Sequence, residues 1–232
     1  MISVLNPNNM DLLEANTIAQ EVFHLLACTC ERIDIAGSIK RREHFIGDIE
    51  IVCLPKSETK IIYPPIEAKS PSLFPDEMNE PVTGEIVGKE KIIVDQEFID
   101  IVNSWTKIKG EPIGRYTQRL LPNKVKLDLF MPTKSDYFRQ LAIRTGDANY
   151  SRFVIATGWK RQGWCGTEDG LRRIDQCDKK NNKWKCIVLK PILPPEWNSE
   201  KEFFDFLDVK MLPPQYRIIN QNDINKIYKN KY

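Results

Sequence analysis

Apolar residues recur along this chain with the periods of helices and strands. They follow helical spacing between residues 12 and 26, which predicts an amphipathic first helix. Runs rich in isoleucine and valine predict strands at residues 32–36 and 47–54. A Gly-Ser pair follows the first of these strands, and a short helix is expected to start near Ser38. The chain is therefore expected to open with a helix, a strand, a glycine turn with a short helix, and a second strand.

The middle of the chain combines an irregular segment with regular elements. Residues 55–90 carry six prolines and little periodicity, so they predict an irregular insertion or a long loop. Apolar spacing then predicts a helix at about 95–104. Three further strands, expected at about 105–110, 115–121 and 124–131, would complete an antiparallel sheet.

The second half is expected to hold two helices, a basic hairpin and a last helix. Ser135 is expected to cap a helix that ends near Arg144, and another is expected at 147–158 after a Thr-Gly turn. Strands near 170–177 and 184–190 would form a lysine-rich hairpin, across which Cys177 and Cys186 would face each other. Ser199 and Glu202 have the spacing of a capping box for a helix through about Leu207.

Two acidic residues lie on one side of the second predicted strand. Asp48 and Glu50 are one residue apart, and strand side chains alternate between faces. Adjacent carboxylates repel each other unless a cation holds them, and magnesium prefers oxygen ligands. The preceding Gly37-Ser38 turn offers backbone N–H groups and a hydroxyl, and Arg41 offers a cation. These are the parts needed to hold a triphosphate beside metal ions.

A third carboxylate is expected, because a two-metal displacement needs one ion on the attacking oxygen and one on the leaving group. Asp128 is the candidate: in its strand Val125, Leu127 and Leu129 point to one face and Asp128 to the other, with Lys126. A charge in an apolar strand is costly to bury without a partner, so Asp128 is expected to border a polar cleft.

Charge and cysteine content exclude some classes of protein. The net charge is +2, but residues 134–190 hold thirteen Lys and Arg against six Asp and Glu, an excess suited to phosphate contacts. The six cysteines show no CxxC spacing and only two histidines are present, so structural zinc and His-dependent hydrolysis are not indicated. Neither a membrane span nor a signal peptide is predicted. The expected location is cytoplasmic or viral and host-intracellular, not secreted.

Together these motifs resemble family X DNA polymerases of the DNA polymerase beta type, reduced to palm and thumb regions. The resemblance rests on the Gly-Ser turn, the three acids and a downstream Thr-Gly. A C-terminal match covers Phe203–Leu207 and Leu212–Arg217. It implies an α+β fold: a nucleotidyltransferase palm with a mixed or antiparallel sheet flanked by helices, and a smaller α+β thumb. The palm would span 1–132, with an irregular insertion at about 55–95, and the thumb 133–232.

The resemblance also implies the activity and the residues that carry it. The activity would be DNA-directed DNA synthesis at a primer 3′-hydroxyl with two Mg²⁺ ions, Mn²⁺ being an alternative. Nucleoside triphosphates and primer–template or gapped DNA would be the partners of a monomer. The three acids, Asp48, Glu50 and Asp128, would be catalytic and bind the metal. The residues that bind the nucleotide would be Gly37, Ser38, Arg41, Arg144, Thr145 and Gly146. The residues that bind the DNA would be Lys126, Ser151, Arg152, Lys160 and Arg161. The lysine-rich hairpin is a further candidate for contacts with the DNA backbone.

Two departures from the family pattern keep other functions open. Glu50 replaces the usual Asp, and Ile143-Arg144 replaces an aromatic pair beside the nucleotide sugar. One alternative is a template-independent or non-DNA nucleotidyltransferase, which would share the three carboxylates. The other is a DNA-end-binding module with a weakened site, which would bind gapped DNA and incorporate nothing.

Overall fold

The largest sheet has five strands and mixed direction. A computed structural model describes residues 10–62, 89–220 and 223. The strand order is β2-β4-β9-β8-β7, with β4 parallel to β9 and the other pairs antiparallel. The expected strands are confirmed, and the pairing makes the sheet mixed. The strands are β2 (Cys30–Ile35), β4 (Ile49–Pro55), β7 (Thr106–Lys109), β8 (Tyr116–Leu120) and β9 (Lys126–Phe130).

One face of this sheet is covered by helices α1 (Leu12–Ala27) and α3 (Gln96–Ser104). Asp11 caps α1 and Asp95 caps α3 through backbone N–H groups of their first turns. The helices bury apolar residues against alternate strand positions, and this group is called the first core. Its fully buried members include Ala15, Ala19, Leu26, Ile49, Ile51, Phe98, Val102, Leu127 and Leu129.

The Gly-Ser turn leads from β2 into the short helix α2 (Gly37–Arg41), as the sequence predicts. Arg42 ends it in the left-handed conformation, with φ of 59°. The two-residue strand β3 (Phe45–Ile46) then pairs with β1 (Met10–Asp11) before the chain enters β4. The α2 turn therefore lies beside the first residues of β4.

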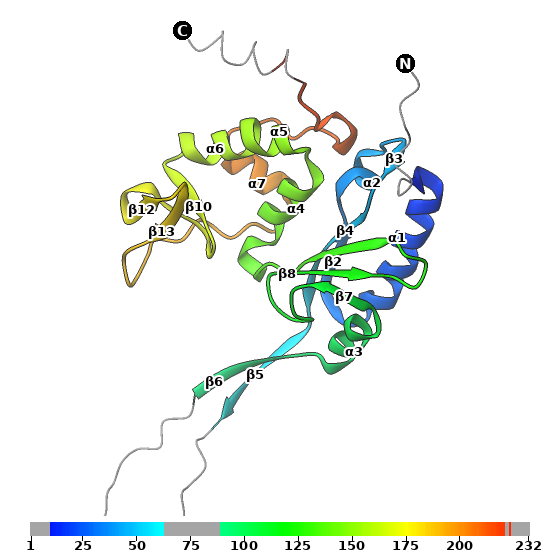
Figure 1. Ribbon diagram of the computed structural model, residues 1–232. Coiled ribbons are helices and arrows are strands. Elements are labelled where there is room, and N and C mark those ends of the chain that lie inside the picture. Colours follow the sequence, from blue (N-terminus) through cyan, green and yellow to red (C-terminus); the bar gives the residue numbers. More distant parts are fainter. Residues whose placement is uncertain (1–9, 63–88, 221–222, 224–232) are drawn as a thin grey trace, which may run out of the picture.

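A two-stranded ribbon replaces part of the expected irregular insertion. β5 (Ser57–Ile62) and β6 (Lys89–Val94) pair antiparallel in continuous register and project from the body of the protein (Figure 1). The expectation of irregular structure was therefore wrong for these strands. Pairing of the backbone explains the ribbon better than burial, since Ile61 and Ile92 remain exposed. The remainder of the expected insertion, 63–88, lies outside the described residues.

The second half packs helices against a four-stranded sheet. The helices are α4 (Tyr137–Thr145), α5 (Ala148–Tyr150), α6 (Ala156–Arg161) and α7 (Glu200–Phe206), with a π-helical turn at Ser151–Ile155. The sheet order is β11-β10-β13-β12, with β10 (Trp164–Thr167), β11 (Gly170–Arg173), β12 (Cys177–Lys180) and β13 (Lys183–Cys186). These elements enclose an aromatic-rich second core that includes Tyr150, Trp159, Trp164, Trp197, Phe203 and Phe204.

Helix α4 connects the two halves. Tyr137 and Leu141 pack on the face of the five-stranded sheet that the first core leaves open, against Val52 and Phe130. The Tyr137 hydroxyl lies 2.9 Å from Asp34 Oδ2 and 3.2 Å from the Val52 carbonyl oxygen. The sheet is therefore covered on both faces, and α4 holds the second half close to β4 and β9.

Two local predictions in the second half need correction. Ser135 lies in a 3₁₀ turn, Lys134–Asp136, and Asp136 occupies the cap position of α4. The hairpin pairs β12 with β13, while Gly170–Arg173 pairs with β10 instead. The Asn181-Asn182 turn sets the register of the hairpin, and each of its strands is four residues long. Cys177 and Cys186 face each other as expected, as free thiols.

The last predicted helix is capped as expected at Ser199, whose hydroxyl oxygen accepts the Glu202 N–H at 3.1 Å. The return contact differs from a capping box, since Glu202 accepts from the Asn198 backbone N–H. Within the described residues, no helix combines the length and apolar character needed to cross a bilayer.

Candidate active site

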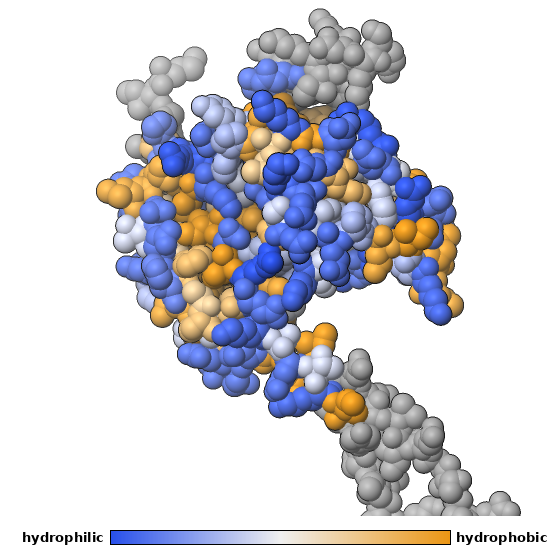
Figure 2. All heavy atoms as spheres, turned by 180° about the vertical axis from the view of Figure 1, so that it is seen from behind, coloured by the Kyte–Doolittle hydropathy of each residue, from blue (hydrophilic) through white to orange (hydrophobic). Residues whose placement is uncertain are grey.

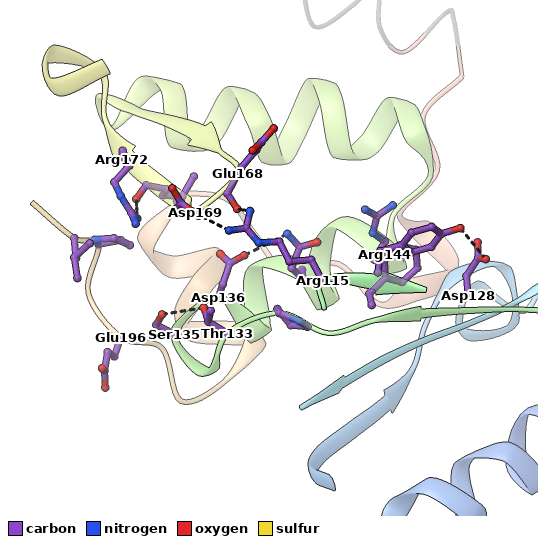
Figure 3. Close-up of a pocket in the computed structure, with 18 of the residues that line it drawn as sticks. Arg115, Asp128, Thr133, Ser135, Asp136, Arg144, Glu168, Asp169, Arg172 and Glu196 are labelled. Atoms are coloured by element: carbon purple, nitrogen blue, oxygen red, sulfur yellow. Dashed lines mark hydrogen bonds and ion pairs between the residues drawn. The ribbon is translucent and has the colours of Figure 1, made fainter. Parts of the chain in front are cut away.

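Glu50 and Asp128 lie directly opposite each other on the parallel strands β4 and β9. Asp48 immediately precedes β4, two residues before Glu50. Glu50 and Asp128 line a cleft of about 1140 Å³ that extends to the 193–196 segment; Figure 3 shows its lining. The structure thus brings the expected carboxylates to one region, and two of them to a cleft wall.

The three acids affect one another electrostatically. Burial raises the pKa of Glu50 to about 7, and the charge of Asp48 adds to the shift. Burial also raises the pKa of Asp48, followed by the charge of Asp128. Arg144 and Arg41 lower the pKa of Glu50 by less than burial and Asp48 raise it. The fold therefore favours the protonated form of Glu50 more than solvent does.

Oxygen ligands of this kind suit Mg²⁺, so the donor chemistry fits a divalent ion. In the ranges that the structure describes, however, no three His, Cys, Asp or Glu side chains are grouped tightly enough to hold an ion as they stand. Asp128 Oδ1 accepts hydrogen bonds from Tyr116 Oη at 3.1 Å and from Gln118 Nε2 at 2.8 Å. Metal binding would therefore require the acids to change rotamer.

Tyr116 and Gln118 were missed by the sequence reasoning. They lie on β8, opposite Phe130 and Asp128 of β9. Alternation places both on the same face of β8, and the strand pairing then places that face beside Asp128. Their spacing could have indicated a shared face, but only the register shows which acid they contact. They are the groups that hold the Asp128 carboxylate in this structure.

The Gly37 turn contacts Glu50 closely. Gly37 has φ of +64°, and a Cβ added there would overlap Glu50 Oε2. The Ala36 N–H donates to the Glu50 carbonyl oxygen at 2.8 Å, which ties the turn to β4. A residue without a side chain is needed at this position because the Glu50 carboxylate takes up the space. Ser38, next in the chain, is half-buried.

Arg41 connects α2 to the end of α4. Its Nε donates to Glu43 Oε1 at 2.7 Å, and its Nη1 donates to the Thr145 carbonyl oxygen at 3.1 Å. The guanidinium is therefore occupied by protein groups where the sequence predicts phosphate contacts. Thr145 itself is fully buried, and its Oγ1 has no hydrogen-bond partner; Gly146 is buried as well.

Arg144 is a cation in the wall of the cleft. Its guanidinium carbon lies 3.9 Å from the centroid of the Phe130 ring, and Tyr116 stacks on Phe130 with 5.2 Å between centroids. Burial lowers the pKa of Arg144, against the charges of Glu50 and Asp128. Its Nε is buried without a hydrogen-bond partner. An unsatisfied buried donor is costly, so this group is a candidate for contact with a ligand.

The predicted DNA-contacting residues lie outside the lining of the cleft. Ser151 Oγ donates to the Ile143 carbonyl oxygen at 2.8 Å, so its hydroxyl is already used. Lys126 is exposed at the start of β9, and Arg152 is exposed near the Phe153 ring. Lys160 and Arg161 are exposed at the end of α6. Their DNA contacts stay predictions.

The far end of the cleft is formed by both halves of the protein. Arg115, just before β8, forms an ion pair with Asp169 of the β10–β11 turn at 2.6 Å and donates to the Glu168 carbonyl oxygen. Asp136 forms a bidentate pair with Arg139, at 2.5 and 2.7 Å. In Figure 3, Arg115, Asp136, Glu168 and Asp169 lie on the other side of Arg144 from Asp128. The cleft is thus longer than the acidic site alone.

Comparison with known proteins identifies the fold. No family model and no curated protein matches the sequence. Among solved structures, the chain is similar to Leishmania infantum polymerase beta, crystallised as a ternary P/T complex. The similarity covers 91% of this chain and 77% of that one, with 19% identity and a TM-score of 0.50. The chain therefore has a polymerase beta-like α+β fold.

Proposed function

We propose that this protein is a DNA-directed DNA polymerase of family X type, which adds nucleotides to a primer 3′-hydroxyl during gap filling. The observation that carries the proposal is the in-register pair Glu50 and Asp128 in a cleft wall, with Asp48 close enough to raise the pKa of Glu50. The polymerase beta-like fold supports it. Residues 1–132 would act as palm and residues 133–232 as thumb.

The three acids would hold two magnesium ions, with manganese as an alternative. Bound there, the ions would lower the pKa of the primer hydroxyl and neutralise charge on the leaving group. Asp48, Glu50 and Asp128 would be the residues that hold them. The primer 3′-oxygen would form a bond to the α-phosphorus as the bond to pyrophosphate breaks.

The remaining site residues would bind the substrates. Ser38 and Arg41 would bind the β- and γ-phosphates; Arg41 carries five N–H donors, so it could keep its Glu43 contact and still donate to phosphate. Arg144, Thr145 and Gly146 would lie beside the nucleotide sugar. Arg144 is the best supported of these three, because it lines the cleft and its buried Nε has no hydrogen-bond partner.

DNA is the proposed macromolecular partner. Lys126 would face the primer phosphate, and Ser151 and Arg152 would face the nascent base pair. Lys160 and Arg161 would meet the phosphate backbone as exposed cations at the end of α6. The solved structure that the chain resembles is a ternary P/T complex, which suits a primer–template ligand here.

Primer extension across a one-nucleotide gap tests the proposal. Asp128→Ala should abolish nucleotide addition, by about 10³-fold or more, since metal-ion stabilisation of the transition state contributes several kcal/mol. Asp205→Asn is the matched control, because Asp205 is an exposed acid on α7, distant in the fold from the three acids. Extension by Asp128→Ala at the wild-type rate would remove Asp128 from the mechanism. Comparing gapped, blunt and single-stranded primers separates template-dependent from template-independent transfer.

A DNA-end-binding module with a weakened site is the second candidate. It is favoured by one observation: the described acids are not gathered as a ready metal site, and the Glu50 carboxylate lies against Gly37. Such a protein would bind gapped DNA and incorporate nothing at any Mg²⁺ or Mn²⁺ concentration. Titrating both ions in the gap-filling assay distinguishes it from the polymerase.

A further inference from the structure

The hairpin of β12 and β13 is a short, basic ribbon at one edge of the protein (Figure 1). Asn181 and Asn182 have φ of 50° and 61°. Left-handed backbone at both positions is typical of a two-residue turn whose twist matches the strands, so the ribbon has a defined register. Its cations outnumber its one acid, Asp178. They are the exposed lysines Lys179, Lys180, Lys183 and Lys185.

Trp184 is the aromatic residue of this ribbon. It is half-buried, and Lys179 lies directly opposite it in the hairpin register. The Lys179 ammonium is 5.9 Å from the centroid of the Trp184 ring. An indole ring beside an ammonium group can stack on a base while the cation attracts phosphate.

The Trp184 ring lies on a row of side chains that begins at the cleft. Across the four-stranded sheet, Gly170 of β11 is opposite Thr167 of β10, and Thr167 is opposite Trp184. Directly opposed residues share a face of the sheet, so these three and Lys179 form one row. Gly170 lines the cleft that holds Glu50 and Asp128 at its other end. The row therefore leads from the cleft to the hairpin.

The apolar core supports the same assignment of faces. Leu171, next to Gly170 and on the opposite face, is fully buried in the second core, as is Trp164. Arg172 lies on the Trp184 face and lines the cleft (Figure 3). The Trp184 face is thus the one turned toward the cleft.

The side chains exposed at this edge also indicate which chemical class of ligand could bind there. Exposed apolar side chains of the following segment gather beside the hairpin (Figure 2), including Ile187, Leu189 and Leu193. The Trp184 end of the row carries a lysine and an indole ring, while the Asp136 carboxylate lies beside its Gly170 end. Positive charge beside an aromatic ring suits an anionic ligand that exposes flat rings. Single-stranded nucleic acid exposes the faces of its bases, whereas duplex DNA exposes them only at its ends.

We propose that the row from Gly170 to Lys179 binds a single-stranded stretch of DNA as it leaves the cleft, with one base stacked on Trp184 and Lys179 near its phosphate. This inference deepens the proposed function, on which it rests for the identity of the ligand. Duplex DNA exposes base faces only at its two ends, and past the cleft only an unpaired extension can reach along the row, so Trp184 contributes to binding only where the substrate carries such an extension.

Fluorescence anisotropy with three labelled DNAs tests this: a single strand, a blunt duplex, and a duplex with a single-stranded overhang. Trp184→Leu should weaken binding of the single strand and of the overhang substrate by about 5- to 150-fold, the range for one lost base stack of about 1–3 kcal/mol. Binding of the blunt duplex should stay within about twofold of wild type. Lys179→Gln should lower the slope of log affinity against log salt by about 0.7 on the single strand.

Trp184→Phe is the matched control, since it keeps an aromatic face and should retain most of the affinity. The difference in fluorescence quenching between wild type and Trp184→Phe on binding an oligonucleotide reports contact with this one indole ring. Thermal unfolding checks that each variant is folded. Equal weakening on all three DNAs, or no weakening, would overturn the inference while primer extension by the wild type stands. If the wild-type protein neither binds nor extends DNA, the proposed function fails with it.

Discussion

Glu50 and Asp128 are directly opposed residues of the parallel strand pair β4–β9. Parallel pairing places two acids from distant parts of the chain at the same height and on the same face of the sheet. Burial, followed by the charge of Asp48, raises the pKa of Glu50 to about 7. The charges of Arg144 and Arg41 lower the pKa of Glu50, but they do not offset the rise. A bound cation would therefore stabilise the ionised form of Glu50.

The contact between Gly37 and Glu50 predicts a large effect of a small substitution. Gly37→Ala should destabilise the protein by about 1–3 kcal/mol, because the residue has positive φ and its Cβ would overlap the Glu50 carboxylate. Urea denaturation of the metal-free protein measures the change.

Glu50→Ala in the Gly37→Ala background isolates the steric part of that cost. The double variant should recover part of the lost stability, since the overlapping carboxylate is gone, while the backbone strain and the 3.1 Å contact with the Cβ of residue 50 remain. Gly114→Ala is the control, a glycine with positive φ and no neighbour within 4 Å of the added Cβ. Strictly additive effects of Gly37→Ala and Glu50→Ala would argue against the contact.

The raised pKa of Glu50 predicts how stability depends on pH. The carboxyl has a pKa of 4.5 without the fold and about 7 within it, so the native state binds the proton more tightly over that interval. The free energy of unfolding should therefore fall as pH rises from about 4.5 to about 7 and then level off, by about 1–3 kcal/mol in total. Denaturation at a series of pH values with chelator present measures it.

Glu50→Gln should reduce this slope, because a neutral amide cannot lose a proton. Part of the slope should remain, since burial and Asp128 raise the pKa of Asp48 in the same direction. Glu97→Gln, an exposed acid in the first turn of α3, should leave the wild-type profile unchanged. Parallel profiles for wild type and Glu50→Gln would show that Glu50 does not titrate in this interval.

Periodicity predicted most of the fold where burial determines the structure. The helix at 12–26 and the strands β2, β4 and β9 follow apolar spacing, because each buries one face in the first core. The ribbon of β5 and β6 does not follow apolar spacing. Its isoleucines Ile61 and Ile92 are exposed, and backbone pairing determines its structure. The register of β10 with β13 is equally invisible in sequence, because parallel pairing joins segments whose own patterns are short.

The site was predictable only in part. Alternation within one strand placed Asp48 beside Glu50, but only the pairing of β4 with β9 placed Asp128 opposite Glu50. The hydrogen bond from Arg41 to the Thr145 carbonyl oxygen depends on how α4 packs against α2, which no local pattern shows.

A buried ion pair ties the C-terminal segment to α7. Arg217 has no exposed surface and donates two hydrogen bonds to Glu200, at 2.6 and 3.0 Å, and one to the Leu212 carbonyl oxygen. Glu200→Ala should cost about 3–5 kcal/mol, because it leaves a buried guanidinium without its counter-charge. Chemical denaturation measures the loss. Lys201→Ala removes the exposed i,i+4 pair with Asp205 on the same helix and should cost less than about 0.5 kcal/mol.

Tyr116 is predicted to position Asp128. Its hydroxyl donates to Asp128 Oδ1, and burial, with Asp128 as the next cause, raises the pKa of the phenol to about 12, so it remains a donor at neutral pH. Tyr116→Phe keeps the ring stacked on Phe130 and removes only the hydroxyl. A hydrogen bond to a charged group contributes about 1.5–3 kcal/mol. The changes in Mn²⁺ affinity and in kcat should each correspond to no more than this free energy, with little effect on KM for the nucleotide.

Two measurements separate positioning from a structural role. Mn²⁺ binding followed by electron paramagnetic resonance reports on Asp128 without any turnover, and gap filling gives kcat and KM separately. Adding Gln118→Leu removes the second donor to Oδ1, so the double variant should show a larger change than the sum of the single ones. Tyr216→Phe, an exposed tyrosine in the C-terminal segment, is the control. If Tyr116→Phe changes thermal stability but neither Mn²⁺ affinity nor kcat, then the Tyr116 hydroxyl supports the fold and does not orient Asp128.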